Sequence, residues 1–498
     1  MKVRRGGIVL PSLAAGVLLA LSLPPFGLWP SAFVGAALLY WRLSGLRLRC
    51  RVLAGWLAGI GCFAVGLSWA ASFNWYGAVV LVGLESLTAA AAGALTPPRG
   101  GRAPVFVAAA TLMEAVRMAW PFGGLPIGGL FLGQAGGPLL GTARLGGPLL
   151  VTALVWAGGV AVGELALVVV RWVDQRRVGA SRWVGPTTLL VVVVAASVGS
   201  VAPDGGAGVR TITVAAVQGG GRRGFNQFEV APAGVFSAQL DASAVLFGSS
   251  RPALVLWPED VIALGRPLEG SPQAARVAGL ARQLGATVLA GVTITEPANT
   301  FRNEIVAWSP RGRIISVFEK VHRVPFGEYV PYRGLFSHLA NLAAVPRDAI
   351  PGHGSGLMTT PAGPLGVLVS YEVFFAARGR SSVRAGAQLL VVPTNTSSYS
   401  SDQMPSQEVA ADRIQAVEEG RDLVQAAPTG YSTVVTNRGV VRQRSRLSAR
   451  QVLVAKVSLR RGATLYERFG DLPVLVLASL ALVAGLARAT RRRAGAAL

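Results

Sequence analysis

The chain has 498 residues, of which 52% are hydrophobic and only 14% are charged, so it is too long and too apolar to be one soluble domain. Its formal net charge is +23, but the arginines responsible cluster between apolar runs and not along one amphipathic face, which argues against nucleic-acid binding. Its two cysteines, Cys50 and Cys62, both lie in the apolar N-terminal part, so the sequence offers neither a disulfide framework nor a Cys/His metal site, and we expect no metal or cofactor.

Apolar runs long enough to cross a bilayer, some of them short or tilted, dominate the N-terminal part of the chain and recur near its end. The predicted spans are Ile8 to Leu23, Leu28 to Trp41, Val52 to Ala71, Tyr76 to Leu95, Pro104 to Trp120, Pro148 to Val170, Val184 to Ala202 and Leu472 to Ala487. The first run has the basic head of a signal peptide but no small-x-small cleavage site, and more apolar runs follow at once, so we interpret it as a span. The sequence therefore predicts about eight crossings. The predicted domains are an N-terminal transmembrane bundle at 1–205, a globular domain at 206–470 and a final helix with a basic tail at 471–498.

Arginine-rich loops indicate how the spans are oriented. They precede the first predicted span and follow the second, fourth, sixth and eighth, so all of them fall on one side of the membrane. Short loops rich in Lys and Arg stay in the cytoplasm. We therefore predict a multi-pass protein of the cytoplasmic membrane whose globular domain is extracytoplasmic. Within the spans, Glu114 and Arg117 have i, i+3 spacing and are predicted to pair on one helix face.

Short β-like runs alternate with helical ones between residue 211 and about residue 469. The predicted strands are TITVAAVQ, ALVLWPE, TVLAGVTI, IISVFEKV, GVLVSYE, QLLVVPTN, DLVQAAPT and STVVTN. Helical periodicity is found from Ser271 to Leu284 and from Gln403 to Glu419. This mixture predicts layered sheets covered by helices.

Three predicted strand ends carry side chains that can do chemistry. They are LVLWPED with Glu259, FEKVHRVPFGEYVP with Lys320 and Glu328, and GVLVSYEVFF with Ser370, Tyr371 and Glu372. Lys320 is informative because the chain has only three lysines, whereas arginine is used freely, and only an ammonium can have its pKa shifted far. Glu259 alone would fit a helix cap or a turn, but beside a lysine it is a candidate general base. His322 fits a structural role better than a catalytic one.

The motifs WPE, K.H.VPFGEYVP and YE, in this order and before the last predicted span, resemble the apolipoprotein N-acyltransferase family. That family belongs to the carbon-nitrogen hydrolase, or nitrilase, superfamily. The stretches LSLPPFGLWP and WPFGGLPIGGLFLGQAGGPL are similar to its first-span turn and its long outer loop, so the resemblance covers nearly the whole chain. It implies a transmembrane bundle joined to a nitrilase-like αββα sandwich with a Glu, Lys, Cys triad.

The resemblance also implies roles for the candidate residues. Glu259 would be the general base, Lys320 would stabilise the tetrahedral oxyanion, and Glu328 and Glu372 would orient the lysine and the substrate amine, with Tyr371 beside them. In the family's reaction a phospholipid donates an acyl chain to the nucleophile, and the N-terminal amine of the diacylglyceryl-cysteine of an apolipoprotein then takes it as an amide. The implied partners are this phospholipid, the diacylated apolipoprotein and the surrounding membrane lipids, with no cofactor.

Three positions depart from the family pattern. Ser370 stands where the family has its cysteine, and a hydroxyl needs a stronger base than a thiol to become a nucleophile. Lys320 could be that base if burial lowered its pKa. In PTNTSSYSSDQ only Tyr399 remains of the family's aromatic lid, and in VQGGGRRGFNQ the ring of Phe225 is left as an apolar wall.

Three hypotheses therefore remain open. The first is an acyltransferase of the lipoprotein-maturation type with Ser370 as its nucleophile. The second is an impaired homologue that binds lipid or lipoprotein or holds a partner membrane enzyme, and the third is another amide or ester hydrolase on the same fold. The first requires Glu259, Lys320 and Ser370 to converge at one pocket.

Overall fold

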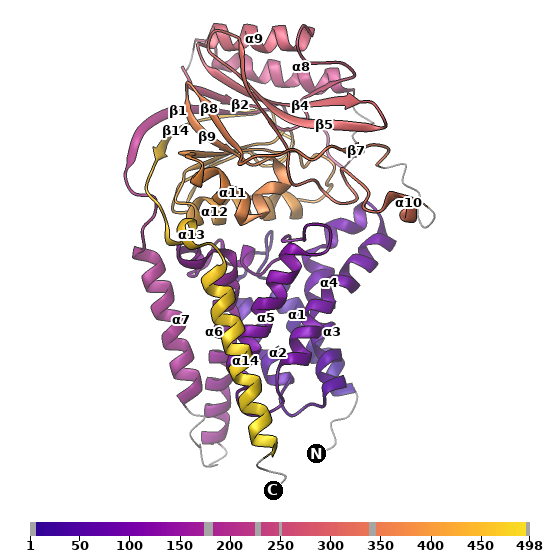
Figure 1. Ribbon diagram of the computed structural model, residues 1–498, viewed down its shortest axis with the longest axis vertical. Coiled ribbons are helices and arrows are strands. Elements are labelled where there is room, and N and C mark those ends of the chain that lie inside the picture. Colours follow the sequence, from indigo (N-terminus) through magenta and orange to yellow (C-terminus); the bar gives the residue numbers. More distant parts are fainter. Residues whose placement is uncertain (1–5, 174–182, 225–230, 249–250, 338–344, 495–498) are drawn as a thin grey trace. The chain divides into compact units, whose positions relative to one another are not determined.

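The computed structural model describes residues 6–173, 183–224, 231–248, 251–337 and 345–494 (Figure 1). The chain divides into two compact units. The first, called the helical unit, comprises Met1–Ala202 and Arg468–Leu498, and the second, called the sandwich unit, comprises Pro203–Glu467.

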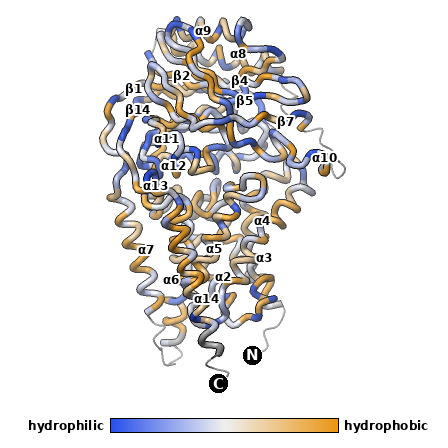
Figure 2. Tube along the Cα trace, viewed as in Figure 1, coloured by the Kyte–Doolittle hydropathy of each residue, from blue (hydrophilic) through white to orange (hydrophobic). Residues whose placement is uncertain are grey.

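The helical unit contains a long helix at each predicted span. These helices are α1 (Gly6–Ala20), α2 (Trp29–Arg42), α3 (Leu48–Gly66), α4 (Trp75–Leu95), α5 (Arg102–Ala119), α6 (Ala143–Val173), α7 (Val184–Val201) and α14 (Leu472–Ala494). Hydrophobic residues run along most of their length (Figure 2). Within the described residues, five apolar helical stretches are long enough to cross a membrane, and they correspond to α3, α4, most of α6, α7 and α14. A total of about eight crossings stays a prediction.

Small residues allow these helices to pack closely. A Cβ atom at Gly55 of α3 would lie only 2.3 Å from the carbonyl oxygen of Ala89 in α4. The predicted pairing of Glu114 with Arg117 is confirmed, with 2.7 Å between a carboxylate oxygen and a guanidinium nitrogen. Because Arg117 is buried, the ion pair also allows its charge to lie inside the bundle.

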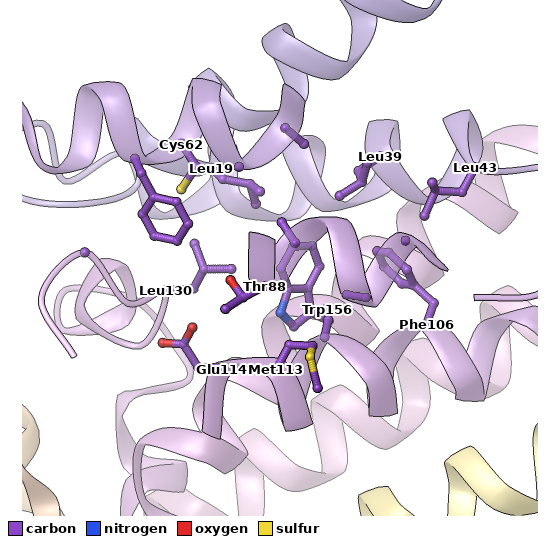
Figure 3. A pocket seen from close by; sticks show the side chains of 18 residues that line it. Leu19, Leu39, Leu43, Cys62, Thr88, Phe106, Met113, Glu114, Leu130 and Trp156 are labelled. Carbon is purple, nitrogen blue, oxygen red and sulfur yellow. The ribbon is translucent and has the colours of Figure 1, made fainter. Parts of the chain in front are cut away.

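The helical unit also encloses a pocket with mostly apolar walls. Figure 3 shows the rings of Phe106 and Trp156 among its lining side chains, together with Cys62 and the carboxylate of Glu114. None of the candidate catalytic residues lines it.

Within the described residues, the sandwich unit contains two β-sheets. In the first, β14 (Gln451–Arg460), β1 (Gly208–Gln218), β2 (Leu254–Leu256), β4 (Thr287–Glu296), β5 (Thr300–Trp308) and β6 (Ile314–Glu319) follow one another, with β3 (Ile262–Leu264) beside β4 and β7 (Asp348–Ala349) beside β5. In the second, the order is β13 (Val441–Arg444), β12 (Thr433–Val435), β11 (Leu423–Ala426), β10 (Leu389–Pro393), β9 (Gly363–Val367) and β8 (Leu357–Thr360).

The two sheets face each other, and helices cover their outer faces (Figure 1). The core between them combines apolar residues of both, such as Leu256 and Phe318 from the first sheet and Val367 and Val391 from the second. Helices α8 (Pro232–Ser243) and α9 (Pro272–Leu284) lie on the first sheet, and α11 (Ala376–Arg384) and α12 (Gln403–Glu418) lie on the second. This confirms the predicted αββα sandwich. The short helix α10 (Arg333–Phe336) also belongs to this unit, and the short helix α13 (Leu465–Phe469) begins in it and extends past its last residue, Glu467.

The predicted strand GVLVSYE is shorter than expected. Strand β9 ends at Val367, and Ser370–Phe374 form a 3₁₀ helix, η7. Strands β5 and β14 were not predicted, because polar residues interrupt TFRNEIVAW and QVLVAKVSLR. Helix α9 begins where its sequence indicates, since the hydroxyl of Ser271 accepts a hydrogen bond from the backbone N–H of Ala274.

Candidate active site

Four strands of the two sheets end at the candidate residues. Glu259 follows β2, Lys320 follows β6 directly, Ser370 follows β9 and Thr394 follows β10 directly. The parallel strands β9 and β10 carry Ser370 and Thr394 at the same edge of the second sheet. The ends of these strands therefore position the polar groups of the site.

Lys320 lies between two carboxylates in a nearly dry environment. Its Nζ donates to Oε1 of Glu259 at 2.8 Å and to Oε1 of Glu328 at 2.6 Å. The Nδ2 amide group of Asn303, from β5, also donates to Oε1 of Glu259 at 2.8 Å and lies 3.3 Å from Oε1 of Glu328. The side chains of Lys320 and Glu259 are only 2% and 4% exposed, so these ion pairs are poorly screened by solvent.

The pKa of Lys320 is shifted in the direction opposite to the one that a catalytic base requires. Burial favours the neutral amine, but the carboxylates of Glu259 and Glu328 outweigh burial and raise the pKa of Lys320 above its usual value. The expectation that Lys320 could act as base for Ser370 is therefore wrong. Lys320 stays an ammonium, which suits the stabilisation of an oxyanion.

Glu372 acts on the backbone and not on the lysine. Its Oε1 accepts hydrogen bonds from the backbone N–H groups of Val321 and His322 at 2.9 and 3.0 Å, and its Oε2 accepts one from Val369 at 2.9 Å. Arg378 lies 3.3 Å from the same carboxylate, which is fully buried. Glu372 thus joins the segment that follows Lys320 to the residue that precedes Ser370, instead of orienting the lysine itself as we expected.

Ser370 occupies a strained turn. Its φ angle is +50°, in the left-handed region that a residue with a Cβ atom rarely adopts. Such strain costs about 1–3 kcal/mol and is concentrated at functional sites. In α/β-hydrolases the nucleophilic serine likewise lies on a sharp, strained strand-to-helix turn. Ser370 is half-buried, and its hydroxyl oxygen lies 3.1 Å from the hydroxyl oxygen of Thr394.

A second set of contacts connects the segment after β10, which carries Thr394, to the Glu259 side of the site. Asn395, next to Thr394, lies with its amide nitrogen 3.4 Å from Oδ2 of Asp260, which directly follows Glu259. Oδ1 of Asp260 accepts a hydrogen bond from Thr293 at 2.6 Å. Burial and the adjacent Glu259 carboxylate raise the pKa of Asp260 to about 7. Glu259 and Lys320 are therefore in direct contact, whereas Ser370 is joined to them through other residues: Glu372 ties its turn to the segment after Lys320, and Thr394 and Asn395 lead from it to Asp260. Among the contacts of the described residues, none joins Ser370 directly to Glu259 or Lys320.

Among the side chains that sequence reasoning missed are Asn303, Thr394 and Glu408. The hydroxyl of Thr394 donates a hydrogen bond to Oε1 of Glu408 in α12, and Glu408 is fully buried. Burial, together with the charge of Glu259, raises the pKa of Glu408 to about 8. The only signal for Asn303 and Thr394 was the presence of a polar residue in or directly after an apolar strand.

The remaining candidates surround this centre. The ring of His322 stacks on Phe375 at 4.2 Å between centroids, which agrees with a structural role, and Tyr371 meets the same ring edge to face at 4.9 Å. Tyr399 is half-buried, and burial and the charge of Glu408 raise its pKa. Phe225 lies outside the described residues. Among the residues that the structure describes, no group of three or more His, Cys, Asp and Glu side chains could hold a metal ion.

Comparison with known proteins gives matches along most of the chain. Residues 15–161 match the apolipoprotein N-acyltransferase N-terminal domain, and residues 213–466 match the carbon-nitrogen hydrolase family. An apolipoprotein N-acyltransferase of Mycolicibacterium smegmatis is 31% identical, and the match covers 95% of this chain and 84% of that protein. One of Allorhizobium ampelinum is 29% identical, covering 90% and 89%. An amidase of known structure from Nesterenkonia sp. aligns with 54% of this chain and 97% of its own, with 19% identity and a TM-score of 0.38.

Proposed function

The chain belongs to the apolipoprotein N-acyltransferase family, and on that premise we propose that Ser370 carries the acyl group during transfer from a phospholipid to an apolipoprotein. Membership in this family makes the protein an acyltransferase of lipoprotein N-acylation with the nitrilase fold. Its apolar helices make it a membrane protein. Neither the scaffold hypothesis nor the hypothesis of a different hydrolase is favoured.

In the first half-reaction, Oγ of Ser370 attacks the ester carbonyl carbon of the phospholipid. The carbonyl oxygen becomes an oxyanion, which the ammonium of Lys320 stabilises. The bond from that carbon to the glycerol oxygen then breaks, and the lysophospholipid leaves with a proton. The product is an acyl ester on Ser370.

In the second half-reaction, the N-terminal amine of the diacylated apolipoprotein attacks this ester. Glu259 takes the proton that the amine nitrogen loses, and the bond between Ser370 Oγ and the acyl carbon breaks as the amide forms. The proton lost by the amine restores the hydroxyl of Ser370, so Glu259 is ionised again and the cycle closes. Glu328 and Asn303 hold Lys320 and Glu259 in position for both steps.

The backbone conformation of Ser370 is the observation that carries this proposal. A serine without a function at this position would be free to relax toward an ordinary conformation or to be replaced by glycine. Instead, Glu372 fixes the preceding residue and the segment after Lys320 through three backbone hydrogen bonds. This arrangement supports a preorganised nucleophile whose turn is tied to the segment that directly follows Lys320.

The arginine distribution supports a cytoplasmic-membrane location with the sandwich unit on the outer side. There the site would meet its two lipid substrates, the phospholipid donor and the diacylated apolipoprotein. Cysteine labelling from either side of intact cells tests this orientation. An exposed position of the sandwich unit such as Arg442 should react from outside, and Arg47, in the loop between α2 and α3, should not, after each is replaced by cysteine.

The nucleophile is tested by incubating the purified protein in detergent with phospholipid and a diacylated lipopeptide. Mass spectrometry should find the triacylated lipopeptide and an acyl group on the peptide that contains Ser370. Both should disappear in Ser370→Ala, and the rate should rise in Ser370→Cys because a thiol ionises more easily. Activity of Ser370→Ala equal to that of the parent would contradict the proposal, as would fatty-acid release without amide formation.

A further inference from the structure

A chain of hydrogen bonds leads from Ser370 into the second sheet's outer layer. The hydroxyl of Thr394 lies 3.1 Å from that of Ser370 and also contacts Oε1 of Glu408. Thr394 follows β10 and Glu408 belongs to α12, so two rigid elements hold the chain in place. Glu408 has no exposed surface, and in the described part of the chain its Oε2 has no hydrogen-bond partner.

We propose that Thr394 and Glu408 form a proton relay that activates the hydroxyl of Ser370. Glu408 does not touch the substrate and acts through Thr394, so it is a positioning and proton-holding residue. The inference rests on the proposed role of Ser370 as the acyl carrier. It assigns the base that a serine at this position requires and that a cysteine needs much less.

The other charged groups of the site are less suited to this task. Lys320 is held as an ammonium by Glu259 and Glu328, and Oε1 of Glu259 already accepts hydrogen bonds from Lys320 and Asn303. Thr394, by contrast, is in hydrogen-bond contact with the hydroxyl of Ser370. The relay therefore reaches the nucleophile through a contact that the structure contains.

The surroundings of Glu408 make it a stronger base than an exposed carboxylate. Burial raises its pKa to about 8, the hydrogen bond from Thr394 opposes the rise, and the charges of Glu259 and Lys320 act on it in opposite directions. Asp412 on the same helix and Tyr399 are the other titratable groups that its charge affects. A base whose pKa lies near the operating pH combines a useful ionised fraction with high proton affinity.

The proton balance of the first half-reaction closes within this relay. As Oγ of Ser370 bonds to the ester carbon, its proton moves to the hydroxyl oxygen of Thr394, and the Thr394 proton moves to Oε1 of Glu408. When the tetrahedral intermediate collapses, Thr394 donates a proton to the departing glycerol oxygen and recovers one from Glu408. The lysophospholipid leaves neutral at that oxygen, and Glu408 is ionised again.

The test compares variants of the relay in two backgrounds, the parent with Ser370 and the variant Ser370→Cys. The acyl adduct on residue 370 is measured in single-turnover reactions of the full-length protein with mixed micelles of phospholipid and detergent, from about pH 5.5 to pH 9.5. In the parent the rate should rise with pH through about 8, because only ionised Glu408 can accept the proton. Glu408→Gln and Thr394→Val should be slower by about 10²-fold and lose this rise.

Matched variants separate the relay from a structural effect. Thr394→Ser keeps the hydroxyl and should retain most of the rate. Asp412 is another buried acid of α12, and its carboxylate accepts a hydrogen bond from Thr433, so Asp412→Asn should leave the rise of the rate with pH in place. In Ser370→Cys, Glu408→Gln should cost less than about threefold, because the thiol needs no relay. Loss of activity in that background as well would overturn the relay and indicate misfolding.

The two proposals fail in different ways. If the parent forms an adduct and Glu408→Gln changes neither its rate nor its pH profile, the relay is wrong and Ser370 remains the acyl carrier. If the parent forms no adduct while Ser370→Cys forms one, the proposed role of Ser370 is wrong and the relay has no purpose.

Discussion

Replacing Lys320 by methionine should destabilise the sandwich unit strongly, because the lysine neutralises two buried carboxylates. Methionine keeps most of the volume of the aliphatic chain but leaves Glu259 and Glu328 sharing Asn303 with no cation between them. Removing one partner of a buried ion pair typically costs about 3–5 kcal/mol. For a unit of this size, that corresponds to a fall in melting temperature of roughly 6 to 15 °C.

The loss should depend on pH in a defined direction. Without the ammonium, burial and mutual repulsion raise the pKa of the carboxyl pair above its value in the unfolded chain. A group whose pKa is raised on folding stabilises the folded state below its unfolded pKa, and that stability is lost as the pH rises through the folded pKa. The stability difference between parent and Lys320→Met should therefore be small near pH 5 and largest at about pH 8.

Hydrogen exchange measured on peptides from residues 203–467, in detergent and with increasing temperature, reports on this unit separately from the membrane helices. Lys456→Met is the matched control, because Lys456 is exposed on β14. Adding Glu259→Gln and Glu328→Gln to Lys320→Met should restore much of the stability, since no unpaired buried charge remains. Equal melting temperatures for Lys320→Met and Lys456→Met, or a difference between them that does not change with pH, would refute this account of the ion pairs around Lys320.

Three further outcomes are expected. Ser370→Gly should have a free energy of unfolding about 1 kcal/mol higher than that of Ser370→Ala, because glycine tolerates the positive φ at this position. This is the reverse of the usual order, and chemical denaturation of the two variants, neither of which carries an acyl adduct, measures the difference. Glu372→Gln should lower kcat of acyl transfer by about tenfold or more with little change in KM, and steady-state kinetics test this split. Glutamine has one acceptor oxygen where glutamate has two, so it cannot accept from Val369 and from the Val321 and His322 pair at once, and the turn shifts. Gly55→Ala should lower the melting temperature of the helical unit, because the added Cβ atom would lie 2.3 Å from the carbonyl oxygen of Ala89. The melting temperature of the sandwich unit should not change, and peptide-resolved hydrogen exchange measures the two units separately.

The sequence predicted the parts of the fold that periodicity and apolar length determine. Long apolar runs have few alternatives to helices in a membrane, and a fully buried strand such as β10 is an uninterrupted apolar run. Strand β5 was missed because Arg302, Asn303 and Glu304 interrupt its pattern, yet it pairs with β4 over nine residues. Its polar residues form ion pairs and hydrogen bonds with the site and with β6. These are tertiary contacts, so the local sequence pattern could not predict them.

The candidate site was predictable only where its residues follow apolar strands. Glu259, Lys320 and Ser370 could be found because a polar group at such a strand end stands out. Glu408 could not, because it is one of several acids in the predicted helix QMPSQEVAADRIQAVE, and nothing in the pattern marks one of them as buried. In the structure nearly all of α12 is buried, so acids that the pattern assigns to solvent lie inside the protein, where burial raises their pKa values.

The positive charge of Lys320 and the need of Ser370 for a separate base are physically connected. Two carboxylates keep Lys320 positively charged, which makes it effective toward an oxyanion and useless as a base. A cysteine nucleophile could function with that arrangement, because a thiol loses its proton readily. The hydroxyl of Ser370, by contrast, retains its proton until a separate base takes it. A cluster that holds the cation thus leaves the proton of the Ser370 hydroxyl to another group. In this chain, Ser370 contacts the hydroxyl of Thr394, which in turn contacts the buried carboxyl group of Glu408.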